Sequence, residues 1–339
     1  MLIIAASKGF RMRKYLEQEL DAIDIKIIRE LVNDGRIPIA HLASKIGIDR
    51  RSAQRRLDRI KSQGIIRIIA HSGQWFMGAS VAVSLGFNVM PGHDVHAVAE
   101  KLSAYPGFGQ IAIAAGPYHI VTWSLFNKRE SLSAFLRNEI GKIPGLASVE
   151  TLIHLETVKN VMTYPIVETT SEEHDTLFFK EEESRKYDPD QLDLAIYKEL
   201  RKDGRIKVAQ LSENLGISRV SASKRLNHLL SEGVIAIFPI IDPGSLGYEV
   251  AARIGFNILP GKIDDVAQKL SSFNMVHFLA VTVGRYDILV GVHFPGLHEL
   301  SDFIREILDK IPEITNHENM IYLDIVKNPF EFITDVNSD

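Results

Sequence analysis

Asp34-Gly35-Arg36-Ile37 recurs as Asp203-Gly204-Arg205-Ile206, so the chain carries a segment and its copy 169 positions apart (203 − 34 = 169). One residue is lost further along, and a shift of 168 then carries Lys159-Asn160 onto Lys327-Asn328. A period this long exceeds that of a solenoid repeat. The sequence therefore predicts two complete copies of a domain pair in one polypeptide.

Composition narrows the class of protein. The chain has 339 residues, 45% of them hydrophobic and 24% charged, which is ordinary for a globular protein of several domains. It has no cysteine, which excludes disulfides, thiolate metal sites and cysteine nucleophiles. No run approaches the roughly 18 apolar residues of a membrane span, and the apolar start is too short for a signal peptide. We expect a cytoplasmic protein with no membrane contact.

Each copy begins with a helical part. Apolar residues at helical spacing predict a helix over about 21–33, ended at Gly35, and a second short helix ended by Gly47. A third helix is predicted over about 50–63, with Asp49 as its N-terminal cap. In the second copy Ser218 takes the place of Asp49. Short helices joined at a sharp glycine turn are typical of a helix-turn-helix.

An α/β part follows. The pattern predicts a strand over 81–89, a helix over about 93–104, strands at 111–114 and 119–126, a helix over about 129–140 and a strand near 149–157. This order is that of the ferredoxin-like split βαβ arrangement, and the second copy repeats it from about 251 to 325. The predicted fold class is α+β: two copies of a helix-turn-helix domain followed by a ferredoxin-like βαββαβ domain.

The expected domains follow from these patterns. They are an N-terminal tail (1–19), a first helix-turn-helix (20–66), a first ferredoxin-like domain (67–162), an acidic linker (163–189), a second helix-turn-helix (190–235), a second ferredoxin-like domain (236–328) and a C-terminal tail (329–339).

The third helix of each copy is a candidate DNA-recognition helix. In the first copy it holds six basic residues against one acidic residue over 50–61. A charge run alone is more often a solvated helix face, but inside a twice-repeated helix-turn-helix it favours DNA binding, because Arg and Gln pair with base edges and phosphates. The candidate DNA-binding residues are Arg50, Arg51, Gln54, Arg55 and Arg59, and in the second copy Arg219, Ser221, Ser223, Lys224 and His228.

The two candidate helices differ at the positions that face outward, so we expect unlike half-sites on double-stranded DNA. Arg56 and Arg225 recur directly before a buried leucine. Two interpretations stay open for them: a salt bridge to Asp24 or Asp193 of the first helix, and a phosphate contact.

The helical part resembles the Lrp/AsnC regulators. The residues that carry the resemblance are Ile23-Asp24, Asp34-Gly35-Arg36, Leu42-Ala43, Gly47 and Arg56-Leu57, with their counterparts in the second copy. The ferredoxin-like part is similar to that family's effector and oligomerisation domain. The resemblance implies a transcription regulator, not an enzyme, with no cofactor, that responds to a small-molecule effector such as an amino acid and assembles as a homo-oligomer.

The resemblance also implies an effector region. The family's Gly-x-Tyr-Asp motif matches Gly284, Tyr286 and Asp287, whereas the first copy has Gly116, Tyr118 and His119. An aspartate at this position can bind an ammonium group by a charge-assisted hydrogen bond, which a neutral histidine does less well. The second copy is therefore the better candidate. The alternative is that both tyrosines only cover the sheet and both glycines only allow the turn.

One chain with two modules predicts an intramolecular pseudo-dimer, with recognition helices about one DNA turn, roughly 34 Å, apart. The main rival hypothesis is an enzyme, since similar modules form sirohaem decarboxylases. It would use histidines, of which the first copy has His41, His71, His93, His96, His119 and His154, but their spacing matches no catalytic pattern or metal site. A third hypothesis is a sensor that has lost DNA binding.

Overall fold

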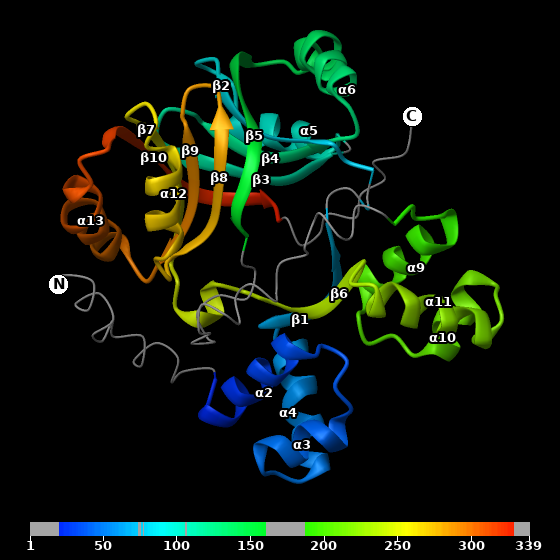
Figure 1. The fold of residues 1–339 in the computed structure, drawn as a ribbon. Coiled ribbons are helices and arrows are strands. Elements are labelled where there is room, and N and C mark those ends of the chain that lie inside the picture. The colour runs from blue at the N-terminus through cyan, green and yellow to red at the C-terminus, as the bar shows by residue number, and fades with distance from the viewer. Residues whose placement is uncertain (1–19, 74–75, 77, 106, 161–186, 329–339) are drawn as a thin grey trace.

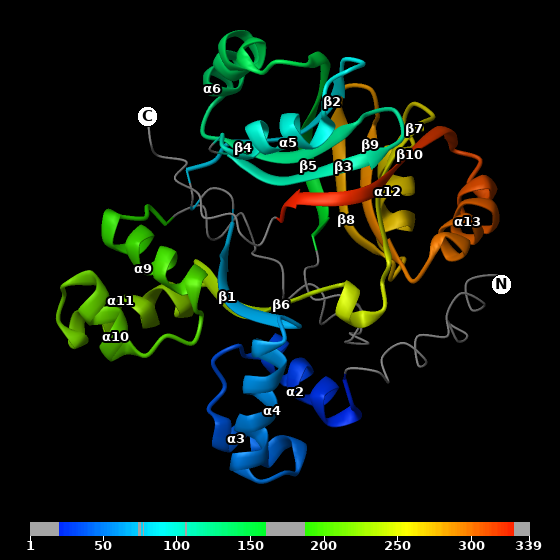
Figure 2. The ribbon, with the colours of Figure 1, turned by 180° about the vertical axis from the view of Figure 1, so that it is seen from behind.

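The computed structural model describes residues 20–73, 76, 78–105, 107–160 and 187–328. Both predicted tails and nearly all of the predicted linker lie outside these residues. Two helical domains stand below and beside a β-barrel, and a two-stranded ribbon runs between the helical domains and the barrel (Figures 1 and 2).

The first helical domain contains the three predicted helices: α2 (Ala22–Asn33), α3 (Ile39–Ile46) and α4 (Arg50–Ser62). The predicted cap is confirmed, because the Asp49 side chain accepts a hydrogen bond from the Ser52 N–H at 2.9 Å. Gly47 ends α3 in the left-handed conformation, with φ of 78°. Ala53, Leu57 and Ile60 of α4 are buried against the other helices, so the basic side chains face outward.

The second helical domain repeats this arrangement with α9 (Gln191–Lys202), α10 (Val208–Leu215) and α11 (Arg219–Ser231). Ser218 caps α11 by accepting from the Ser221 N–H at 3.1 Å. Ala222, Leu226 and Leu229 occupy the buried stripe. The local signals that define a helix-turn-helix are thus present in both copies.

The ribbon that follows each helical domain was not predicted. It consists of β1 (Ile66–Ser72) and β6 (Ile235–Ile241), paired antiparallel. Ile69 pairs with Phe238, which is the same position in the second copy, so a pseudo-twofold axis passes through this pair. The turn glycines bond to the ribbon, with Gly35 N–H donating to the Ile237 carbonyl and Gly204 N–H to the Ile68 carbonyl. The ribbon therefore fixes one helical domain against the other.

The two ferredoxin-like domains have matching elements. The first comprises β2 (Val81–Val89), α5 (Val95–Ser103), β3 (Phe108–Ala115), β4 (Ile120–Phe126), α6 (Arg129–Ala134) and β5 (Leu146–Asn160). The second comprises β7 (Val250–Ile258), α12 (Ile263–Ser271), β8 (Val276–Val283), β9 (Ile288–Phe294), α13 (Leu297–Glu306) and β10 (Ile314–Lys327). Short 3-10 turns lie at Gly244–Leu246, Ile140–Lys142 and Leu308–Lys310. The helix predicted over 129–140 changes to a π-helix at Phe135–Glu139, and the last strand is longer than predicted.

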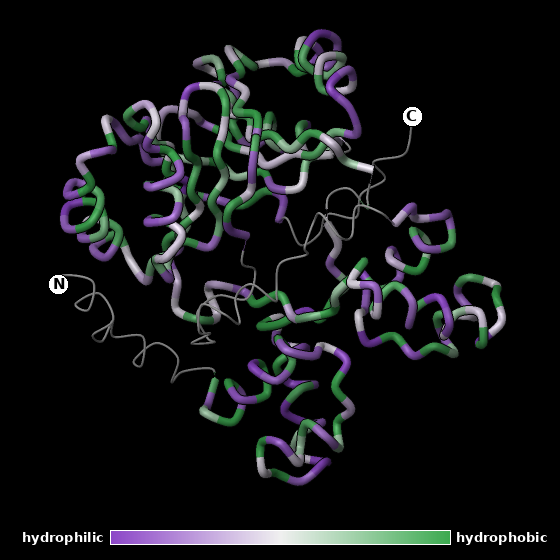
Figure 3. The backbone as a smooth tube through the Cα atoms, viewed as in Figure 1, coloured by the Kyte–Doolittle hydropathy of each residue, from purple (hydrophilic) through white to green (hydrophobic). Residues whose placement is uncertain are grey.

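The strands close into one barrel in the order β10-β3-β4-β2-β5-β8-β9-β7. Within each copy this is the ferredoxin-like order, and the two sheets join at both edges, through β10 with β3 and β5 with β8. The two sheet domains thus pair within one chain. Apolar residues predominate along the strands of the barrel, whereas hydrophilic and hydrophobic residues alternate along the helices (Figure 3).

Each copy also caps a helix of the other. Lys159 at the end of β5 donates to the Ser271 and Phe273 carbonyls at the end of α12. Lys327 at the end of β10 donates to the Ser103 carbonyl at the end of α5. A cation at a helix C-terminus satisfies free carbonyls and the helix dipole. The Lys-Asn repeat noted in the sequence therefore joins the two copies.

Candidate nucleic-acid interface and effector region

The outer face of α4 presents the predicted basic residues. Arg50, Arg51, Gln54 and Arg55 are exposed. The Gln54 amide donates to Asp58 one turn on, at 2.8 Å. This face offers several cations in its first two turns, where a recognition helix contacts base edges.

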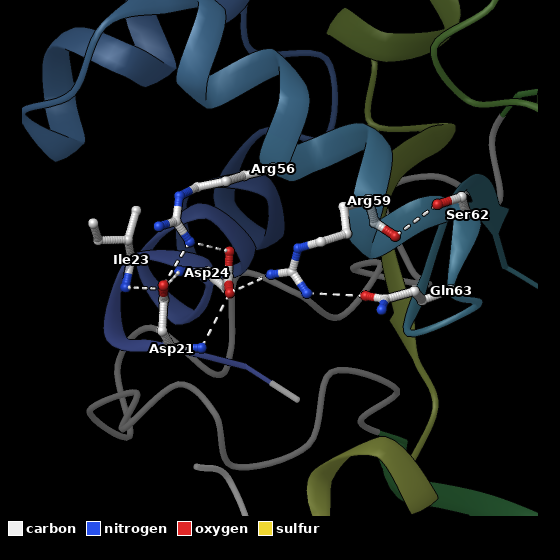
Figure 4. A network of polar contacts seen from close by, with 7 residues as sticks. All are labelled: Asp21, Ile23, Asp24, Arg56, Arg59, Ser62 and Gln63. Carbon is white, nitrogen blue, oxygen red and sulfur yellow. Dashed lines mark hydrogen bonds and ion pairs between the residues drawn. The ribbon is translucent and has the colours of Figure 1, made fainter. Parts of the chain in front are cut away.

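Arg56 and Arg59 lie beside the buried stripe of the same helix, with side chains 25% and 37% exposed, and bind a buried carboxylate. Arg56 Nη1 is 2.6 Å from Asp21 Oδ2 and 2.9 Å from Asp24 Oδ1, and Arg59 Nη2 is 2.5 Å from Asp24 Oδ2. Asp24 is only 1% exposed, so these arginines supply its counter-charge (Figure 4). The hydrogen bonds to Asp21 and Asp24 raise the pKa of Arg56. The salt-bridge interpretation of Arg56 is thus observed.

The corresponding carboxylate of the second copy is Asp193. Arg225 contacts it at 3.3 Å and also contacts Asp190 at 2.7 Å. The position equivalent to Arg59 is His228, which is exposed and does not replace that arginine; instead, the Tyr187 hydroxyl donates to Asp193 at 2.8 Å. The two copies therefore support the same buried acid with different partners.

The outer face of α11 is less basic. Arg219, Lys224 and His228 are exposed, and Ser221 and Ser223 are half-buried. Val220, in the place of Arg51, is 78% exposed and was not among the predicted DNA-binding residues. An exposed aliphatic group at the start of a recognition helix can contact a thymine methyl group. The difference between Val220 and Arg51, which are equivalent positions of the two copies, could have identified this residue from the sequence.

The glycines of the effector region sit in the seam between the copies. Gly116 and Gly284 have φ of 149° and 145°, values that side chains rarely adopt. A Cβ on Gly116 would collide with the Asn319 carbonyl of β10, and one on Gly284 would lie 2.7 Å from the Thr151 carbonyl of β5. Each turn therefore packs on the last strand of the other copy.

Tyr118 and Tyr286 point inward at one end of the barrel and are almost fully buried. The Tyr118 hydroxyl donates to Glu150 at 2.7 Å and the Tyr286 hydroxyl to Glu318 at 2.6 Å. Burial, together with these carboxylates, raises the pKa of both phenols. Arg285 bridges the two glutamates, at 2.7 Å from Glu318 and 3.3 Å from Glu150. This network was not predicted from the sequence, although Glu150 and Glu318 are related by the same 168-residue shift.

Asp287 and His119 have the same structural task. Asp287 Oδ2 accepts from the Ile258 N–H at 2.8 Å, and His119 Nδ1 accepts from the Val89 N–H at 2.9 Å. These amides end equivalent strands of the two copies. The acid and the imidazole are therefore interchangeable here as backbone acceptors, which accounts for the departure of the first copy from the motif.

Comparison with known families matches both copies. The AsnC-type helix-turn-helix domain matches residues 20–61 and a winged helix-turn-helix DNA-binding domain matches 189–236. The Lrp/AsnC ligand binding domain matches 84–164 and 252–331. An uncharacterised helix-turn-helix-type transcriptional regulator of Pyrococcus horikoshii is 34% identical over 145 residues, which are 42% of this chain and 92% of that protein. The chain belongs to the Lrp/AsnC family.

A second regulator matches a similar share of this chain. The transcriptional regulator FL11 of Pyrococcus horikoshii is 31% identical over 42% of this chain and 94% of its own length, so it corresponds to one module. A solved structure with both modules is the siroheme decarboxylase NirDL, with a TM-score of 0.63 and 16% identity over 90% of this chain and 92% of that one. At this identity the similarity concerns the fold. Among the described residues, no helix is long and apolar enough to cross a membrane.

Proposed function

We propose that this Lrp/AsnC chain is a sequence-specific DNA-binding transcription regulator in which α4 and α11 bind two half-sites from one rigid frame. The observation that carries this proposal is the β1–β6 ribbon, whose pseudo-twofold axis passes through Ile69 and Phe238. A two-part DNA site with pseudo-twofold symmetry requires protein elements with the same symmetry. A single chain then does what a dimer of one-module chains would do.

The exposed chemistry of the two helices supports unlike half-sites. Arg51 and Arg55 of α4 offer two long cations that can pair with guanine or phosphate. The equivalent positions in α11 carry Val220 and Lys224, which favour a thymine methyl group and phosphate. The proposed operator is therefore asymmetric in sequence although symmetric in spacing. Arg59 was predicted to bind DNA, but its guanidinium is bound by Asp24. We therefore propose that Arg59 stabilises the position of α4 and does not contact DNA.

Selection from a random double-stranded DNA pool tests this proposal. We expect a two-part motif whose halves differ, with affinity that falls steeply as salt rises, because phosphate contacts release counterions. Arg55→Ala should lower the slope of log affinity against log salt by about 1. Lys101→Ala, which removes an exposed lysine of α5, is the matched control and should leave the slope unchanged. Lack of enrichment at any salt concentration would refute DNA recognition.

We further propose that a small-molecule effector, such as an amino acid, binds beside the turns that carry Gly116 and Gly284. The match to the Lrp/AsnC ligand binding domain supports binding of an effector. Because both turns lie in the seam between the two copies, an effector bound there would contact both halves of the protein that hold the recognition helices. Since Asp287 Oδ2 is engaged by Ile258, the acid has one oxygen left for a ligand ammonium. Isothermal titration with the twenty amino acids tests this. Binding that survives Asp287→Asn would exclude Asp287 as the ammonium partner.

Assembly into homo-oligomers is also proposed. Leu155 and Leu323 occupy equivalent positions in the second halves of β5 and β10 and are 64% and 67% exposed. Light scattering of the wild type and of the double variant Leu155→Lys, Leu323→Lys would show whether these residues bury one another between chains. A DNA-binding regulator works where the DNA is, so the cytoplasm is the proposed location.

A second candidate is a sirohaem decarboxylase-like activity, favoured by the fold similarity that covers both modules. Under the main proposal the chain is not an enzyme. Titration with sirohaem separates the two: a new Soret band and release of carbon dioxide would favour the enzyme, whereas an unchanged protein spectrum would favour the regulator.

A further inference from the structure

Arg253 on β7 is an arginine buried inside the barrel. The whole residue is only 8% exposed. Its Nε donates to the Tyr322 hydroxyl at 3.1 Å and its Nη2 to the Gln110 amide oxygen at 3.2 Å. The guanidinium carbon lies 4.3 Å from the ring centre of Phe278. All these partners are neutral.

No negative charge balances this cation within the described part of the chain. No carboxylate there lies within ion-pair distance of Arg253, and its buried Nη1 finds no acceptor among the same residues. The guanidinium of an arginine is charged in proteins, so the cost of burying it is not avoided by loss of a proton. A buried charge is strongly disfavoured unless it is paired and hydrogen-bonded.

The surroundings of Arg253 carry no compensating charge either. His154, His277 and His293 are buried nearby, and burial together with neighbouring positive groups lowers the pKa of each ring, to about 3 for His154 and His293. These rings are therefore neutral at physiological pH. The nearest acids described above, Glu150 and Glu318, have partly exposed side chains and are already bound by Tyr118, Tyr286 and Arg285.

A narrow cavity opens beside the guanidinium between the two sheets. Its lining includes Arg253, Ser84, Tyr118, Thr122, Leu152 and Met320. It has room for one small occupant. Ser84 occupies the position equivalent to Arg253, and its hydroxyl lies 2.9 Å from His154 Nε2. The first copy thus contributes a neutral donor where the second contributes a cation.

We propose that the barrel binds one small monovalent anion of about chloride size, which accepts from the Arg253 guanidinium in this cavity. The pseudo-twofold pair Ser84 and Arg253 supplies one positive charge per barrel, which matches one negative charge. A cation is disfavoured by the guanidinium, and within the described residues no group of three potential metal ligands exists. The anion would neutralise the core of the closed barrel and bridge its two sheets.

Thermal unfolding in different sodium salts at equal ionic strength tests the proposal. Chloride or bromide should raise the unfolding temperature by about 2 °C or more over gluconate, which is too large for the cavity. Arg253→Ser, which installs the residue of the first copy, should abolish this difference. Arg129→Met, an exposed arginine of α6, is the control and should keep it. Equal stabilisation by gluconate, or a halide effect that persists in Arg253→Ser, would overturn the proposal.

Anomalous diffraction from wild-type crystals grown in bromide gives an independent result that does not depend on a folded variant. We expect a bromide peak inside the barrel within hydrogen-bonding distance of the Arg253 guanidinium. Bromide peaks confined to the outer surface would refute the site. A peak in the barrel without the thermal effect would mean an adventitious ion only, and would equally reject a structural role.

Discussion

Arg36 and Arg205 make the same contact in opposite directions. Arg36 Nη1 donates to the Gly204 carbonyl at 2.5 Å, and Arg205 Nη1 donates to the Gly35 carbonyl at 2.7 Å. Their second nitrogens reach the Ile206 and Ile37 carbonyls at 3.0 and 2.7 Å. The motif that reveals the duplication is therefore also the clasp between the two helical domains.

Removal of one of these two arginines should weaken the contact between the two helical domains. Arg36→Met is expected to lower the free energy of unfolding by about 2 kcal/mol, because it removes two hydrogen bonds from a charged donor. If DNA binding is two-part as proposed, affinity for the full site should fall while affinity for an isolated half-site stays unchanged. Urea denaturation and fluorescence anisotropy measure these quantities. An equal loss for half-site and full site would place the effect within one domain and contradict the clasp.

Arg55 and Arg59 should separate DNA contact from stability. Arg59→Ala leaves the buried Asp24 with Arg56 as its remaining counter-charge and should lower stability by about 1 kcal/mol or more. Arg55→Ala should change stability by less than about 0.5 kcal/mol and lower the salt slope of DNA binding. Urea midpoints and salt titrations of both variants test this contrast. A stable Arg59→Ala protein with a reduced salt slope would reverse the assignment.

Gly86 and Gly255 make room for the buried tyrosines. A Cβ on Gly86 would lie 2.5 Å from the Tyr118 ring, and Gly255 is related to Tyr286 in the same way. Gly86→Ala should destabilise the barrel by about 1–3 kcal/mol through overpacking. Gly141→Ala is the matched control, because nothing lies within 4 Å of the added carbon. Equal unfolding temperatures for the two variants would show that the Tyr118 ring can move aside.

Acid should weaken the fold through the buried histidines. Burial lowers the folded-state pKa of His71 well below 6.5 and that of His154 and His293 to about 3. The unfolded chain then binds more protons than the folded one below pH 6.5, so stability falls with pH from there toward pH 3, by up to about 1.4 kcal/mol per pH unit for each histidine. Denaturation at pH 7.0, 6.0 and 5.5 measures this before most carboxylates titrate.

His71→Ile provides the matched variant for the pH experiment. Its counterpart in the second copy is Ile240, so the fold accepts isoleucine at this position. The wild-type ring stacks on Phe238 at 3.6 Å between centroids. The variant should lose stability less steeply between pH 7.0 and 5.5. A slope equal to that of the wild type would show that His71 does not titrate on unfolding in this range.

Local signals explain what the sequence could predict. The caps Asp49 and Ser218, the end of α3 at Gly47 and the buried stripe of α4 depend on neighbours within one or two turns, and all of them are observed. The ferredoxin-like order also follows from strand and helix patterns. The exposed face of α4 follows directly from the positions that remain once the stripe is buried.

The features that could not be predicted from the sequence depend on pairing between distant segments. Ile66–Ser72 has no partner within its own copy, so its role as a ribbon strand depends on a segment about half the chain away. Local patterns also do not show that the sheet edges join through β5 with β8 and β10 with β3. The Asp287 and His119 difference suggested a lost ligand contact, yet both side chains accept a backbone amide, because an imidazole nitrogen and a carboxylate oxygen serve equally as acceptors.

Fusion of the two halves of the barrel into one gene lets a central position hold two different residues at once. In a ring assembled from two identical chains, Arg253 would face a second arginine across the axis, and two like charges would share one cavity. Here Ser84 stands opposite it. Residues at equivalent positions of the two copies can therefore change independently. The same holds for the outer faces of α4 and α11, which are related by the same symmetry.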